Sequence, residues 1–275
     1  MVKIVFSVIG LLACLFIGTK EGSAYLLDPD CAVSRSLPRI MGGRDTDILS
    51  NPWMVLVIGP KLETGVKFCG GFVLTAAHCI DSGPMKVRLG EYDNQYLMED
   101  CSSGICLPRS FEVDVDKTFA YIQCSYKNDI GILRMSKTIP YSDFVRPICI
   151  LIDEEIGYVP LFSVTGWGRT ERSDSSKVLQ VATLQNIDRN QCAESFKSEF
   201  DVAQICAGNY TSDSCVEDSG GPLSAVRTYK GHNRTFQYGI VSLHSCGGLG
   251  VYTNVTHFTD FILSVLEYLR ISELD

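Results

Sequence analysis

Short apolar runs separated by turn residues fill the chain from Ile40 onward, and this texture constrains the fold more than any other feature of the sequence. Residues 55–58, 86–89, 162–167 and 238–242 have the length and composition of β-strands. The sequence contains 24 glycines, spread through the chain, but no fixed-period repeat and no linker-like tract. Many short strands with turns between them predict an all-β fold built from barrels or a sandwich.

The C-terminal segment follows a helical pattern instead. Its apolar residues recur at the spacing of one helix face, namely Phe258, Phe261, Ile262, Val265, Leu266 and Leu269. Thr256 is the expected N-cap, and Asp260 near the start and Arg270 near the end complement the helix dipole. We therefore predict a core-packing helix here, and a shorter helix around Asp188–Phe196.

The first 24 residues have the pattern of a secretory signal peptide. A short basic start, Met1-Val2-Lys3, precedes the apolar stretch Ile4–Thr19, and Gly22-Ser23-Ala24 offers small residues for cleavage. The apolar stretch has 16 residues, whereas a membrane span needs about 20. We expect cleavage after Ala24, with an uncleaved anchor as the alternative.

Charge and cysteine content narrow the compartment and the class of partner. The formal net charge of −8 at pH 7 argues against binding to nucleic acid or to an acidic membrane surface. Twelve cysteines point to an oxidising compartment, and the eleven that remain after loss of Cys14 with the signal are an odd number. Sequons for N-glycosylation begin at Asn209, Asn233 and Asn254, which suits a secreted, extracellular chain.

Three short motifs, far apart in the chain, contain a histidine, an aspartate and a serine in that order. They are Thr75-Ala76-Ala77-His78-Cys79, Asn128-Asp129-Ile130-Gly131-Ile132-Leu133 and Glu217-Asp218-Ser219-Gly220-Gly221-Pro222-Leu223. Each is weak alone, because such residues also occur as a packed histidine, a cap or a tight turn. Together, from residue 39 to about residue 270, they resemble the trypsin-like (chymotrypsin-fold) serine proteases of the S1 family.

This resemblance implies a fold and a division of the chain. We expect an all-β protease domain over residues 40–270, made of two six-stranded antiparallel β-barrels (roughly 40–150 and 151–257) and a C-terminal α-helix. Residues 25–39 would be an activation prosegment. The chain is similar to insect proteases of the easter or clip type in its protease part, although the prosegment is too short to hold a clip domain.

The resemblance also implies acyl transfer by a Ser-His-Asp triad. Ser219 would attack the scissile carbonyl, because the imidazole of His78 can accept its proton near neutral pH. Asp129 would hold the imidazole tautomer and stabilise its cation. The backbone N–H groups of Glu217 and Ser219 would form the oxyanion hole.

The resemblance also implies how the protease would be activated and which substrates it would prefer. A cut between Arg39 and Ile40 would free an amino group that pairs with Asp218, so an upstream trypsin-like activating protease is an expected partner. The residues expected at the specificity pocket are Asp213, Ser242, His244 and Gly250. Because a carboxylate at the pocket floor attracts Lys or Arg, the expected substrates are proteins with Arg or Lys before the cut, and serpin-type inhibitors are further candidate partners.

Disulfide pairs follow from the resemblance as well. They are Cys31–Cys149, Cys69–Cys79, Cys192–Cys206 and Cys215–Cys246, with Cys101 and Cys106 closing a small loop of their own. The first pair would tether the cut prosegment to the catalytic chain. Cys124 is then left as a thiol or bonds to another chain.

Departures from the family's pattern keep a second hypothesis open. Glu217 and His244 stand where the family has glycines, at the oxyanion hole and at the pocket mouth. Between Cys69 and Cys79 the chain has several residues fewer than the family, which would strain that disulfide. The alternative is a catalytically impaired homologue that binds and regulates in an extracellular protease cascade, as in insect immunity or development.

Metal and nucleotide chemistry find little support. The sequence has no His-Glu-x-x-His motif, no second cysteine pair to complete a zinc site with Cys101 and Cys106, and no Gly-rich loop before a Lys-Ser/Thr pair. We expect no cofactor. A structural calcium ion near Glu91, with Glu99 or Asp100, is the one metal candidate, and a solvated acidic loop is its alternative.

Overall fold

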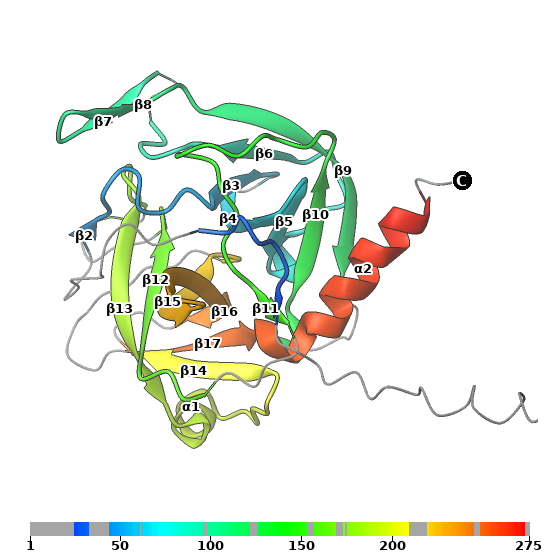
Figure 1. The fold of residues 1–275 in the computed structure, drawn as a ribbon. Coiled ribbons are helices and arrows are strands. Elements are labelled where there is room, and N and C mark those ends of the chain that lie inside the picture. The colour runs from blue at the N-terminus through cyan, green and yellow to red at the C-terminus, as the bar shows by residue number, and fades with distance from the viewer. Residues whose placement is uncertain are drawn as a thin grey trace, which may run out of the picture.

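Two β-barrels lie side by side, and the C-terminal helix packs beside the first (Figure 1). The structure of the chain, a computed structural model, describes residues 25–32, 44–60, 62–95, 98–121, 126–152, 157–168, 173, 175–208, 219–244 and 248–272. Within these ranges, no helix is both long enough and apolar enough to cross a membrane.

Six antiparallel strands close the first barrel in the order β10-β5-β4-β3-β6-β9. The strands are β3 (Met54–Ile58), β4 (Leu62–Cys69), β5 (Phe72–Thr75), β6 (Lys86–Leu89), β9 (Phe111–Ala120) and β10 (Gly131–Met135). Successive side chains of a strand point to opposite faces, so Val55 and Val57 fill the barrel while Leu56 joins the apolar cluster shared with the C-terminal helix.

The second barrel runs in the order β12-β15-β16-β17-β14-β13 and closes through the pairing of β12 with β13. Its strands are β12 (Leu161–Gly166), β13 (Gln180–Ile187), β14 (Gln204–Gly208), β15 (Pro222–Tyr229), β16 (His232–His244) and β17 (Leu249–Asn254). Strand β2 (Arg44–Asp45) adds to β13 from outside. The predicted fold class, two six-stranded barrels with a C-terminal helix, is confirmed.

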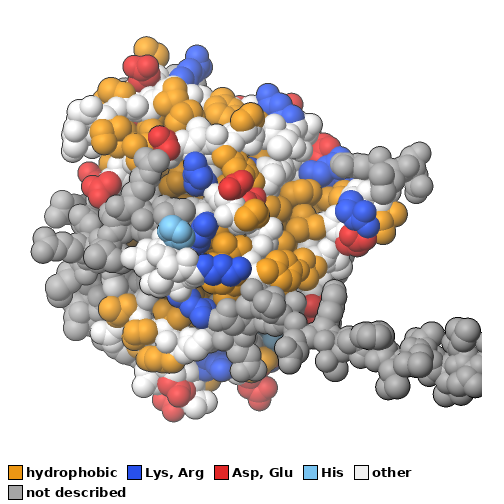
Figure 2. Space-filling view, viewed as in Figure 1, with side chains coloured by type: hydrophobic (Ala, Val, Ile, Leu, Met, Phe, Trp, Pro, Cys, Tyr) orange, Lys and Arg blue, Asp and Glu red, His pale blue; other side chains and the backbone are white. Residues whose placement is uncertain are grey.

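Shorter elements complete the chain. Strands β1 (Tyr25–Leu26) and β11 (Leu151–Ile152) pair, as do β7 (Asp100–Ser102) and β8 (Ile105–Leu107). Among the described residues, short 3₁₀ helices occupy Ala77–Cys79, Tyr126–Asn128 and Val255–Phe258, and the α-helices are α1 (Arg189–Phe196) and α2 (Thr259–Ser272). Hydrophobic side chains remain visible on the surface beside α2 (Figure 2), and the exposed ones on this helix include Tyr268 and Ile271.

The predicted helices are present, but one cap was predicted wrongly. Asp188 caps α1 by accepting a hydrogen bond from the N–H of Asn190 at 2.8 Å, as the predicted helix boundary indicates. Helix α2 begins three residues after the expected Thr256, because a 3₁₀ turn precedes it. The side chain of Asn254 caps that turn, since it accepts from the N–H of Thr256 at 3.3 Å.

The connection from β4 to β5 shows how the barrel accommodates its short sequence. Only Gly70 and Gly71 join the two strands, and Gly70 has a positive φ of 34°, a conformation that glycine adopts readily. Thr75 ends β5 in register with Gly131 of β10, so the barrel stays closed although the hairpin is tight.

The predicted Cys69–Cys79 disulfide is wrong. Both residues remain thiols. Cys69 lies at the hairpin turn, opposite Phe72, whereas Cys79 follows the far end of β5. Four residues of strand cover about 10 Å, and a disulfide needs Cα atoms about 4.4–6.8 Å apart. Because the hairpin is short, Cys69 and Cys79 lie at opposite ends of β5, too far apart to form a disulfide.

Candidate active site

His78 and Asp129 meet at one end of the first barrel. His78 lies in the 3₁₀ turn that follows β5, and Asp129 lies just before β10, the strand that pairs with β5. The Nδ1 atom of His78 is 2.6 Å from Oδ2 of Asp129, and the backbone N–H of His78 donates to Oδ1 at 3.0 Å. Two contacts to one carboxylate fix both the ring and the turn that carries it.

The second barrel contributes two further contacts to Asp129. The Ser242 hydroxyl donates to Oδ2 at 2.6 Å, and the Thr253 hydroxyl donates to the backbone carbonyl at 2.9 Å. Asp129 is only 5% exposed, so these donors replace water that burial removes. Sequence reasoning placed Ser242 at the substrate pocket and did not select Thr253. In the structure, both hydroxyls hold Asp129 in place by donating hydrogen bonds to it.

Burial and hydrogen bonding set the charges of this pair. Burial raises the pKa of Asp129, but hydrogen bonds from His78 and Ser242 outweigh it, so the pKa lies below its usual value. The hydrogen bond to Asp129 raises the pKa of His78 above its usual value of 6.5, and a second one with Cys79 adds to the effect. The geometry therefore stabilises the imidazolium that forms when the His78 ring accepts a proton.

Ser219 is held against the first barrel through its backbone. Its carbonyl accepts a hydrogen bond from the N–H of Thr64 at 3.0 Å. The next residue, Gly220, has φ of +80°, and a Cβ atom there would overlap the Thr64 carbonyl and the Thr75 hydroxyl. That hydroxyl donates to the same carbonyl at 2.8 Å. Glycine after the serine is thus required for the barrels to approach this closely.

Ser219 lies beside the end of β5 that leads to His78, because a Cβ atom on the next residue, Gly220, would come within 3.1 Å of the Ala76 nitrogen. Within the described part of the chain, no hydrogen bond links the Ser219 hydroxyl to the His78 ring. Such bonds are often long before substrate binds, so the arrangement is compatible with a resting enzyme. The half-buried Ser219 sits where β4, β5 and β16 meet, since Gly220 also donates to the Val241 carbonyl at 3.0 Å.

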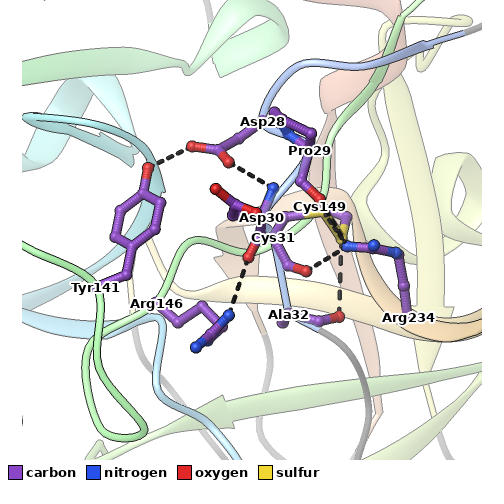
Figure 3. Close-up of a disulfide and its surroundings, with 9 residues drawn as sticks. All are labelled: Asp28, Pro29, Asp30, Cys31, Ala32, Tyr141, Arg146, Cys149 and Arg234. Carbon is purple, nitrogen blue, oxygen red and sulfur yellow. Dashed lines mark hydrogen bonds between the residues drawn. A yellow bond between two sulfur atoms is a disulfide. The ribbon is translucent and has the colours of Figure 1, made fainter.

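The structure contains three of the predicted disulfides. They are Cys31–Cys149, Cys101–Cys106 and Cys192–Cys206, with Cα–Cα distances of 5.0, 4.1 and 6.1 Å. The first joins the segment before the predicted activation cut to the connection between the barrels, and Figure 3 shows its surroundings.

Glu91 does not suit the calcium ion that the sequence suggested. Its Oε2 atom accepts from the Ser110 hydroxyl at 2.9 Å and from Arg88 at 3.4 Å, and its Oε1 atom accepts from the N–H of Tyr92 at 3.1 Å. Asp100 is likewise held by backbone N–H groups. Among the described residues, no group of three or more metal-ligating side chains occurs. The carboxylates here are engaged by protein donors.

Two of the three predicted glycosylation sequons fall on described residues. Asn233 is exposed at the tip of the β15–β16 hairpin. Asn254 is different, because its side-chain amide donates to the Val202 carbonyl at 2.8 Å and its oxygen caps the 3₁₀ turn. A glycan on Asn254 would have to displace these contacts. The Asn233 oxygen accepts from the Thr228 hydroxyl at 2.7 Å, and a glycan on the Asn233 nitrogen would leave that bond in place.

Comparison with known proteins decides the family. The Trypsin family model matches residues 40–262 of the chain, which contain the whole site just described. The chain belongs to the trypsin family.

This trypsin-family chain is related to insect clip-domain proteases. It is 35% identical over 283 residues to the CLIP domain-containing serine protease HP8 of Bombyx mori, covering 91% of this chain and 76% of that one. It is 34% identical over 267 residues to the Spaetzle-processing enzyme of Drosophila melanogaster, covering 83% and 66%. The crystal structure of the Drosophila Grass clip serine protease of the Toll pathway matches with a TM-score of 0.73 and 28% identity, covering 85% and 73%.

Several predicted site residues of this trypsin-family protease lie outside the described residues. They are Arg39, Ile40, Cys124, Asn209, Asp213, Cys215, Glu217, Asp218 and Cys246, and the predicted signal peptide at residues 1–24 also lies outside them. Gly250 is described, and it pairs with His244 across β16 and β17. The activation site, the pocket floor and one oxyanion donor therefore remain predictions.

Proposed function

We propose that this chain is the zymogen of a secreted serine endopeptidase that cuts protein substrates after Arg or Lys. The observation that carries the proposal is the hydrogen-bonded set of His78, Asp129 and Ser242, with Ser219 anchored beside it by the N–H of Thr64. A buried carboxylate on Nδ1 leaves Nε2 of the imidazole for the serine proton, which is the arrangement that activates a hydroxyl nucleophile.

The reaction would proceed by acyl transfer. As the Ser219 oxygen bonds to the carbonyl carbon, its proton passes to Nε2 of His78, and Asp129 stabilises the resulting imidazolium. His78 then gives this proton to the leaving amine, and the peptide bond breaks. Water, deprotonated by the same imidazole, releases the acyl group from Ser219.

Activation would follow cleavage between Arg39 and Ile40 by an upstream trypsin-like protease. The new amino group of Ile40 would pair with Asp218. Because burial desolvates both charges, such an ion pair adds little stability, and its role would be to switch the site on after the cut. Asp213 would give the preference for Arg or Lys. The Spaetzle-processing enzyme is a relative whose name states that it processes Spaetzle, and we propose a processing role in an extracellular protease cascade for this chain.

A second candidate has its own support. The thiol of Cys79 forms a hydrogen bond with the His78 imidazole instead of a disulfide. With Glu217 and His244 at positions where the family has glycine, these features favour a catalytically impaired homologue that binds partners in a cascade.

One experiment separates the two. The chain secreted from expressing cells would be cut at Arg39 with a trypsin-like protease, freed of that protease, and assayed on an Arg-peptide amide and on a matched Asp-peptide amide. Hydrolysis of the Arg-peptide alone, lost in Ser219→Ala, is the expected result. Silence in the native chain with activity in Glu217→Gly would refute an active native enzyme and support the binding homologue.

A further inference from the structure

A buried polar cluster links the segment before the activation cut to the β4–β5 hairpin. The Tyr141 hydroxyl donates to the carboxylate of Asp28 and accepts from the N–H of Gly70 at 3.0 Å. Lys67, with no exposed surface, donates to the Gly70 carbonyl and lies 5.1 Å from the centre of the Tyr141 ring. One tyrosine therefore contacts the prosegment on one side and the hairpin turn on the other.

The prosegment itself is fixed by several independent contacts. Asp28 also accepts from the N–H of Asp30 at 2.9 Å, and Arg146 donates to the carbonyl of Asp30 at 3.3 Å. Arg234 donates to the carbonyls of Pro29 and Cys31, and the disulfide of Cys31 lies next to them (Figure 3). Asp28 is thus presented to Tyr141 from a firmly placed segment.

Strand β4 carries this link to the catalytic serine. Lys67 and Thr64 are three residues apart on one continuous strand. The N–H of Lys67 donates to the Trp53 carbonyl and its carbonyl accepts from Ile148, both at 2.9 Å, while the N–H of Thr64 donates to the Ser219 carbonyl. A displacement of the hairpin along its strand direction would therefore reach the nucleophile over about 10 Å.

Charge explains why the tyrosine and the aspartate are needed together. A buried ammonium is costly unless it is paired, and the direct contacts of Lys67 on the described residues are a carbonyl and an aromatic face. Burial lowers the pKa of Lys67 to about 8, and the nearby Cys69 and the negative charge of Asp28 oppose that change. Without Asp28, the hairpin would hold a charged lysine among neutral groups.

We propose that Tyr141 and Asp28 are positioning residues, through which the prosegment sets the place of hairpin β4–β5 and hence of Ser219. The disulfide Cys31–Cys149 would keep this contact in the cut enzyme. The catalytic part of this inference rests on the proposed function, whereas the structural coupling does not.

The coupling is tested first in the uncut, full chain by amide hydrogen exchange. Tyr141→Phe removes the hydroxyl but keeps the ring, and Asp28→Asn removes the charge at nearly the same volume. Because a hydrogen bond is worth roughly 0.5–1.5 kcal/mol, exchange of residues 64–68 should be about 2- to 13-fold faster in each variant. Asp30→Asn, an exposed carboxylate on the same segment, is the matched control and should leave exchange unchanged.

The second measurement uses the cut enzyme and separates positioning from binding. In Tyr141→Phe and Asp28→Asn, kcat on an Arg-peptide amide should fall about tenfold while KM stays within twofold. Unchanged exchange in both variants, or exchange that accelerates equally throughout the chain, would overturn the coupling. Faster exchange confined to β4 in a chain that is inactive even as wild type would uphold the coupling and refute the proposed function. Should Tyr141→Phe not fold, Asp28→Asn decides alone.

Discussion

The hydroxyl of Ser242 makes the most quantitative test of the site. It donates at 2.6 Å to the carboxylate of Asp129, which is 5% exposed. A hydrogen bond to a charged group contributes about 1.5–3 kcal/mol, and a buried charge that loses a donor has no water to replace it. Ser242→Ala should therefore lower the free energy of unfolding of the uncut chain by about 1.5–3 kcal/mol.

Urea unfolding at pH 7 measures this change, and a double-mutant cycle tests its cause. In an Asp129→Asn background the acceptor is neutral, so the cost of Ser242→Ala should shrink to about 0.5–1.5 kcal/mol. Ser264→Ala is the control, because that hydroxyl donates to a backbone carbonyl on the exposed face of α2 and its loss should cost no more than about 0.5 kcal/mol.

The pH dependence of the same variant has a definite sign. The pKa of Asp129 is lowered in the folded chain, so its contribution is present above the unfolded value of 3.8 and is lost as pH falls through the folded pKa. The difference between wild type and Ser242→Ala should therefore narrow below pH 3.8. If Ser242→Ala lowers the free energy of unfolding equally in the wild-type and Asp129→Asn backgrounds, and equally at pH 7 and below pH 3.8, the charged hydrogen bond is not the cause of the loss.

Three further results are expected. Gly220→Ala should destabilise the chain by more than about 1 kcal/mol and abolish hydrolysis, whereas Gly231→Ala, with the same φ of +80° but open space around it, should retain activity in the peptide assay. Cys79→Ala removes one of the hydrogen bonds that raise the pKa of His78, so the ascending limb of a kcat/KM–pH profile should move to lower pH; a fixed limb would contradict that role. Mass spectrometry of the secreted chain should show that Asn233→Gln removes a glycan.

The pairing of His78 with Asp129 and the two barrels could be predicted because the sequence motifs resemble those of trypsin-like serine proteases, whose fold they imply. Asp129 lies just before β10 and His78 lies just after β5, and the pairing of these two strands brings both side chains to one barrel end. Helix α2 was predictable from periodicity alone. The first residue of α2 could not be predicted in this way. Phe258 lies in the preceding 3₁₀ turn but packs in the same apolar cluster as the helix, so the apolar spacing does not mark where the helix begins.

The role of Ser242 was harder to predict, since it depends on contact between the barrels. Its hydroxyl lies at a register shift of β16, between Val241 and Leu243, where the pairing with β17 is interrupted. Such a shift turns one side chain toward a neighbour that strand alternation would not give it. Sequence patterns within one strand contain no information on this orientation.

The wrongly predicted Cys69–Cys79 disulfide shows that a short hairpin affects side-chain contacts more than backbone hydrogen bonds. The N–H of Thr64 and the carbonyl that receives the Thr75 hydroxyl are backbone groups, and any residue at that point of β4 could supply them. A disulfide depends on one particular side chain, so it is lost when the residues between Cys69 and Cys79 are too few to return the chain to the same place. Sliding a strand along its axis keeps the ladder and the closed barrel but changes which side chain stands at each position. Backbone support of Ser219 therefore survives in this chain, while the cysteine beside His78 keeps its thiol.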